Sequence, residues 1–279
     1  MVELDNTLAK AKENLSKATE LRRKGMLAES IGEYKQSLKI KPDFIGAIVD
    51  LAKVYETQKK WGEASKCYQK LIAFRPNNHV GYLKLAKTLK QNKKIYGAIA
   101  AYAEAIELKP DLPARVYKDY GDLLIQVNST NSDAIAAYIK AAEMKQNWGF
   151  GFYNKLANLF EKQGNLTEAT TYYLKALNLQ EDNPQLYFNV GNIYFKQGLL
   201  NKAVGNYKRA LQLKPDFSNV YHKLGDLFKQ RNQSDDAIKC YQKALEIKPD
   251  FKTAYRSLGD VLMTQGKQSI AQKCYQKAQ

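Results

Sequence analysis

The 279-residue chain has few of the residues that metal centres, disulfides and catalytic sites require. It contains three cysteines and two histidines, and neither histidine has cysteines or carboxylates around it at the spacing of a metal site. No glycine-rich phosphate loop, nucleophile elbow or zinc-ligand spacing occurs. We therefore expect no metal, no cofactor and no enzymatic activity of its own.

The chain also lacks long apolar stretches. No run approaches the 18 apolar residues of a membrane span, which argues against a membrane partner. The first residues, MVELDNTLAKAKENL, have no apolar core of a secretory signal. We predict a cytoplasmic protein, and in that reducing compartment we expect Cys67, Cys240 and Cys274 to stay unpaired.

Acidic residues are scarce relative to basic ones. The 28 acidic residues against 44 basic ones give a net charge of +16, and the excess lies in two basic ends around a neutral middle at 113–183. Such a charge suits an acidic protein, a membrane surface or a nucleic acid, or it only decorates solvated helix faces. RNA is the less favoured partner, because the lysines of the second and third repeats have no aromatic residues among them for base stacking.

A tyrosine recurs along the chain at a nearly constant interval. Small residues at two further positions recur at the same interval, and so does a proline in five of seven repeats. A period of this length predicts helix pairs that stack into a solenoid. Tyr221, Leu224, Gly225 and Phe228 show the spacing of an amphipathic helix within one repeat. Eight tyrosines mark the period, at intervals of 34 to 36 residues: Tyr34, Tyr68, Tyr102, Tyr138, Tyr173, Tyr207, Tyr241 and Tyr275.

These recurring positions resemble the tetratricopeptide repeat, although tyrosine replaces the family's tryptophan near the start of the first helix. The resemblance implies an all-α, right-handed α-solenoid superhelix of helix-turn-helix repeats, forming one domain over 1–279. Eight repeats are expected at 11–44, 45–78, 79–112, 113–149, 150–183, 184–217, 218–251 and 252–279.

The resemblance also implies a concave groove lined by the first helix of each repeat. The second and third repeats place lysines there, and the later repeats place asparagines. An asparagine amide can donate and accept hydrogen bonds at once, which suits the backbone of an extended peptide. The candidate ligand-binding residues are Lys53, Lys84, Lys87, Asn154, Asn158, Asn189, Asn192, Asn219, His222, Lys223 and Arg256.

The asparagines resemble the ladder of O-GlcNAc-transferase-type repeats and, in part, the clamp that grips a terminal carboxylate. Two cationic positions of that clamp are absent, so we do not expect strong carboxylate binding. Alternatively, asparagine is simply a frequent exposed residue in this chain.

Two functions follow as hypotheses. The first is a protein-interaction scaffold that binds an extended peptide or partner segment, an acidic one included. The alternative is the substrate-recruiting arm of a larger transferase, such as a glycosyltransferase, whose catalytic domain is absent here. The apolar stripe at 270–278 further predicts weak self-association through the C-terminal helix.

The fourth repeat is irregular. It is longer than the others, with apparent insertions at Pro113 and Gly149, a long turn at 126–133 and the aromatic run 148–153 directly after it. One interpretation is a hinge beside an aromatic pocket. The other is a drifted repeat whose aromatic side chains fill the space that the distortion leaves.

Overall fold

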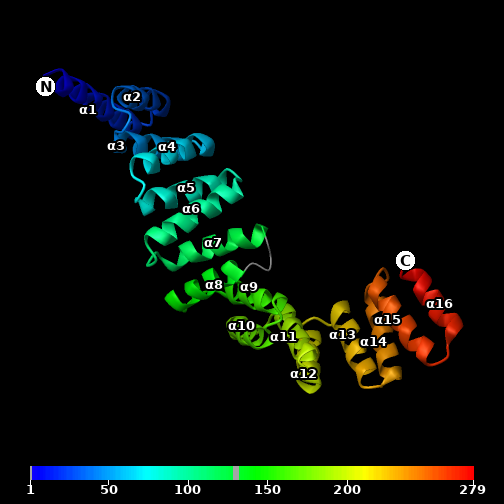
Figure 1. Ribbon diagram of the computed structural model, residues 1–279. Helices are drawn as coiled ribbons and strands as arrows, with labels where there is room; N and C mark the ends of the chain where they lie inside the picture. The colour runs from blue at the N-terminus through cyan, green and yellow to red at the C-terminus, as the bar shows by residue number, and fades with distance from the viewer. Residues whose placement is uncertain (1, 128–131) are drawn as a thin grey trace. The chain divides into compact units, whose positions relative to one another are not determined.

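The computed structural model describes residues 2–127 and 132–279, with side chains from residue 6 onward. Over these residues the chain forms sixteen α-helices and no strand, and the helices follow one another as helix-turn-helix pairs (Figure 1). The predicted all-α repeat fold is therefore confirmed.

The chain divides into two compact units, 1–144 and 145–279. The expectation of a single domain with a superhelical shape over 1–279 stays a prediction. The first unit holds α1 Val2–Arg23, α2 Leu27–Ile40, α3 Ile45–Thr57, α4 Trp61–Phe74, α5 His79–Gln91, α6 Ile95–Leu108, α7 Ala114–Val127 and α8 Ser132–Met144. The second holds α9 Phe150–Lys162, α10 Leu166–Leu179, α11 Pro184–Lys196, α12 Leu200–Leu213, α13 Ser218–Gln230, α14 Ser234–Ile247, α15 Lys252–Thr264 and α16 Gln268–Lys277.

Within each unit every helix packs against the helix before it and the helix after it. The connections are only a few residues long, so consecutive helices run antiparallel. Turns inside the pairs therefore lie at one edge of each unit, and the loops between pairs lie at the opposite edge.

The repeating tyrosine is the core of each pair. Seven of the eight are at most 1% exposed, and they project from the even-numbered helices. The facing position on the odd-numbered helix must be small. A Cβ at Gly225 would lie 2.5 Å from Cε1 of Tyr241, and a Cβ at Gly191 would lie 2.6 Å from Cε1 of Tyr207. The small residue at this position therefore allows the two helices of a pair to approach closely.

The aromatic run after the fourth repeat is packed, not open. Phe152 and Tyr153 are buried, and Trp148 stacks on Phe152 with ring centroids 4.5 Å apart. Tyr172 stacks in turn on Phe160 at 5.5 Å. These contacts favour the interpretation in which the aromatic side chains fill space, and they argue against the one in which the side chains line a pocket. The hinge stays a prediction, because half of the irregular turn at 126–133 lies outside the described residues.

Candidate functional site

The polar side chains of the odd-numbered helices in the second unit are first of all partners of the buried tyrosines. The hydroxyl of Tyr173 lies 2.7 Å from Oδ1 of Asn158 and 2.7 Å from Oε2 of Glu161, and it donates to these two acceptors. The hydroxyl of Tyr207 donates to Oδ1 of Asn192 at 2.8 Å. Burial raises the pKa of both tyrosines far above the usual range, so both remain donors at physiological pH. Asn158 and Asn192 therefore position the core, a role that the sequence prediction missed.

The next two pairs repeat this arrangement with a carboxylate. Tyr241 donates to Oδ1 of Asp226 at 2.9 Å, and Tyr275 donates to Oδ1 of Asp260 at 3.1 Å. The sequence carried a signal for this pairing. The acceptor stands fifteen residues before the tyrosine in each of these repeats, and it is an asparagine or an aspartate, whose side-chain oxygen can accept a hydrogen bond.

Asn154 and Asn189 differ from Asn158 and Asn192 in that neither accepts a hydrogen bond from a buried tyrosine. Both are half-buried, and Nδ2 of Asn189 donates to Oδ1 of Asn154 at 3.3 Å, a long hydrogen bond between adjacent repeats. Gln185 donates to Oδ1 of Asn189 at 2.9 Å, and Asn158 donates to the backbone oxygen of Asn154 at 2.7 Å. We call the two predicted pairs on α9 and α11 the amide face: Asn154, Asn158, Asn189 and Asn192.

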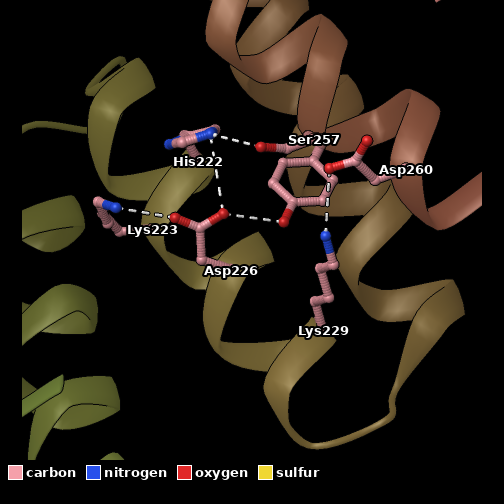
Figure 2. A network of polar contacts seen from close by, with 7 residues as sticks. His222, Lys223, Asp226, Lys229, Ser257 and Asp260 are labelled. Atoms are coloured by element: carbon pink, nitrogen blue, oxygen red, sulfur yellow. Dashed lines mark hydrogen bonds and ion pairs between the residues drawn. The ribbon is translucent and has the colours of Figure 1, made fainter. Parts of the chain in front are cut away.

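A second polar network continues along α13 and α15 (Figure 2). Nε2 of His222 lies 3.1 Å from Oγ of Ser257 and 3.8 Å from Oδ1 of Asp226. Nζ of Lys223 donates to the other oxygen of Asp226 at 2.8 Å. Burial lowers the pKa of His222, with a smaller opposing effect from Asp226, so the imidazole is neutral near pH 7. His222 and Ser257 thus form a neutral polar pair between adjacent repeats.

The predicted cations of this unit differ in availability. Lys223 is engaged with Asp226, whereas Arg256 is exposed and makes no hydrogen bond or ion pair within the described part of the chain. Asn219 is likewise exposed at the start of α13.

The predicted lysine group lies in the first unit, apart from the amide face in sequence. Nζ of Lys53 pairs with Oδ1 of Asp50 at 2.9 Å. Lys84 is half-buried, and Lys87 is exposed. Because Lys53 occupies the position of the tyrosine acceptor, Tyr68 donates instead to Glu56 at 3.2 Å.

No cluster of metal-binding side chains occurs in the residues that the structure describes, and none of the helices described is long and apolar enough to cross a membrane. The three cysteines are unpaired. Burial raises the pKa of the Cys67 and Cys240 thiols to about 11.

These features define a helical repeat protein whose polar residues face along one side of the odd-numbered helices. Family models agree with that class. The model described as TPR repeat matches residues 157–198, 191–230 and 225–266, and the model described as tetratricopeptide repeat matches 80–112. Together they cover about half of the sequence. The chain belongs to the tetratricopeptide repeat family.

Part of the chain is similar to a curated enzyme. It is 27% identical over 136 residues to human protein O-mannosyl-transferase TMTC3, and 25% identical over 144 residues to its Drosophila melanogaster counterpart. The matches cover 43% and 46% of this chain but only 15% of each relative, so the chain corresponds to a small part of those proteins.

Solved structures share the fold. YrrB, described as a TPR protein with an unusual peptide-binding site, has a TM-score of 0.57 at 20% identity, over 68% of this chain and 96% of YrrB. MamA gives 0.51 at 27% identity, over 57% of this chain and 91% of MamA. The Naa15/Naa10 complex bound to HypK-THB gives 0.66 at 16% identity, over 91% of this chain and 39% of the matched chain.

Proposed function

We propose that this protein is an interaction scaffold that binds an extended peptide segment of a partner along the amide face. The observation that carries the proposal is the side-chain hydrogen bond between Asn154 and Asn189. The bond is long and joins adjacent repeats, and its two amides offer both donors and acceptors. A peptide backbone can replace this weak internal bond with two hydrogen bonds of its own.

The contacts around these two amides support this assignment. Asn158 and Asn192 accept hydrogen bonds from Tyr173 and Tyr207. Their side chains are therefore part of the core packing, and the proposal does not require them to contact the peptide. Asn189 is fixed from one side by Gln185, which leaves its amide group oriented. A binding group that is already oriented loses less entropy when the ligand arrives.

An acidic partner fits the positive charge of the chain and the exposed arginine on α15. Arg256 is exposed and unpaired within the described residues, and the whole chain carries a charge of +16. YrrB, which shares this fold, is described as having a peptide-binding site.

The test is a peptide-array screen followed by affinity measurement of a selected peptide against Asn154→Ala plus Asn189→Ala. Two lost hydrogen bonds of about 0.5–1.5 kcal/mol each would weaken binding by roughly 5- to 150-fold. Asn206→Ala is the matched control, because Asn206 lies on α12 and bonds only the backbone of Lys202. Unchanged affinity in the double variant would count against the amide face.

The second candidate function is the substrate-recruiting arm of a larger transferase. It is favoured by the match to protein O-mannosyl-transferase TMTC3, which covers nearly half of this chain. The reading frame in the native gene tests it. A transferase domain encoded in frame with these repeats would support this function, and a reading frame with no transferase domain on either side of them would contradict it.

Weak self-association through α16 is also proposed, together with a cytoplasmic location. Ile270 on this helix is 53% exposed, whereas Ala271 and Cys274 are buried against the preceding pair. Sedimentation at rising concentration is the measurement. Ile270→Ser should shift the protein toward monomer, and a monomeric wild type at high concentration would contradict the proposal.

A further inference from the structure

Two turns in the first unit hold a lysine in a strained backbone conformation. Lys59 follows α3 with φ of 56°, and Lys93 follows α5 with φ of 58°. This left-handed region is open to glycine but unfavourable for a residue with a Cβ. A further turn of this kind has Asn232 at φ of 60°, and asparagine tolerates this region better than lysine. Four more turns place glycine here, at φ between 74° and 80°: Gly25, Gly164, Gly198 and Gly266. The fold would be served better by glycine, so the lysine side chains point to a role outside folding.

Each strained lysine begins a short basic and aromatic sequence. Lys59 is followed by Lys60 and Trp61, and Lys93 is followed by Lys94, Ile95 and Tyr96. All four lysines are exposed, and Tyr96 at 75% is the most exposed large hydrophobic residue in the part of the chain that the structure describes.

None of the four lysines has an ion-pair partner within the described residues. Cations in the last turn of the odd-numbered helices pair with acidic residues in both units: Lys90 with Asp119 at 3.1 Å, Lys196 with Glu161 at 2.7 Å and Lys229 with Asp260 at 3.3 Å. The four turn lysines differ from these neighbours, because they face solvent without such a partner.

The two turns lie next to each other. Helix α4 packs against α5, and a Cβ at Gly62 would lie only 3.7 Å from Nδ2 of Asn92. The two turns therefore form one continuous surface at the edge of the unit. We call it the basic edge: Lys59, Lys60, Trp61, Lys93, Lys94 and Tyr96.

We propose that the basic edge binds the surface of an anionic lipid membrane. Lysines close to such a surface are attracted by its negative charge, and tryptophan and tyrosine rings favour the boundary between headgroups and acyl chains. The residues project from turns at an edge, which suits a flat surface. A single nucleic-acid strand would instead need rings for successive bases, and only two rings are present here. Since no described helix can span a membrane, the contact would be peripheral.

The first test is sedimentation of the intact chain with vesicles of phosphatidylserine and phosphatidylcholine, against vesicles of phosphatidylcholine alone. We expect binding only to the anionic vesicles. Lys59→Gly plus Lys93→Gly should weaken it roughly 25-fold, because each lysine near the surface contributes about fivefold. The same variant should unfold at an equal or higher temperature, because glycine relieves the strain at both turns. Lost binding without lost stability separates a binding role from a structural one.

A charge-matched control removes two exposed lysines elsewhere. Lys208→Gln plus Lys273→Gln lowers the net charge equally on the second unit and should retain binding. Equal losses in the control and in the glycine variant would overturn the proposal, since binding would then follow net charge alone. Tyr96→Ser should weaken binding without affecting the fold, because this ring is mostly exposed.

Tryptophan fluorescence provides a direct readout of contact. In the Trp148→Phe background Trp61 is the only tryptophan of the chain, and its emission should shift to the blue with phosphatidylserine vesicles. An unshifted emission would overturn the proposal. So would tighter binding of a single-stranded RNA oligonucleotide than of the vesicles, which would assign the edge to nucleic acid.

Discussion

Replacing Gly225 by alanine tests how the tyrosine packs inside a helix pair. The added Cβ would lie 2.5, 2.7 and 2.9 Å from three ring atoms of Tyr241. That ring has little freedom to move, because it is fully buried and its hydroxyl is held by Asp226 at 2.9 Å. The substitution therefore forces α13 and the ring apart.

The magnitude is a balance of two effects. Overpacking of this kind costs about 1–3 kcal/mol, while alanine in a helix interior gains about 1 kcal/mol over glycine. The net loss of stability should be about 0–2 kcal/mol. The fifth repeat suggests the lower half of that range, because Ala157 already faces the fully buried Tyr173 there.

A matched control removes the helix-propensity effect. Gly205→Ala makes the same chemical change in α12, where nothing lies within 4 Å of the new Cβ, and should stabilise the chain by about 1 kcal/mol. Gly225→Ala should therefore be about 1–3 kcal/mol less stable than Gly205→Ala.

Urea denaturation measures this difference, and hydrogen exchange of α13 and α14 locates it, because repeat proteins can open locally. Equal stability of the two variants would refute the packing of Tyr241 against Gly225.

Three further predictions concern the polar residues and thiols. Asn192→Ala should lower the free energy of unfolding by about 1–2 kcal/mol in urea denaturation, because it removes the acceptor of the Tyr207 hydroxyl. Asn154→Ala should leave that free energy nearly unchanged, and equal effects of the two substitutions would contradict the assigned roles. Because the pKa of His222 is lowered in the folded protein, the unfolded chain takes up the proton first as pH falls below about 6.5. The free energy of unfolding should therefore decrease as pH falls through this range. His222→Gln should remove that part of the pH dependence. With its pKa raised to about 11, the Cys67 thiol should react with iodoacetamide far more slowly in the native protein than in urea, as followed by mass spectrometry, and equal rates would contradict its burial.

The fold could be predicted because its determinants are repeated. One buried tyrosine and one small facing residue per repeat, such as Tyr207 and Gly191, are enough to specify a close helix pair. Eight copies of the pattern leave little ambiguity about period or element type. The fourth repeat departs from the period because of its insertions, yet its helices α7 and α8 lie within the expected range 113–149.

The candidate site was only partly predictable. The sequence placed Asn158 on the polar face, but asparagine suits two roles at that position. It could bind a peptide, or it could accept the hydrogen bond of Tyr173. Only the three-dimensional contact distinguishes them. The strain at Lys59 was also hidden, because a lysine in place of glycine does not reveal its backbone angle.

The central claim, that a partner segment lies along the amide face, is tested most directly by photocrosslinking. A benzoylphenylalanine replaces Asn189 on α11 in one variant and Asn206 on α12 in another, and each is irradiated with the peptide selected by the array. The account predicts a crosslink from position 189 and none from position 206. A crosslink from position 206 alone would place the partner on the even-numbered helices and contradict the account.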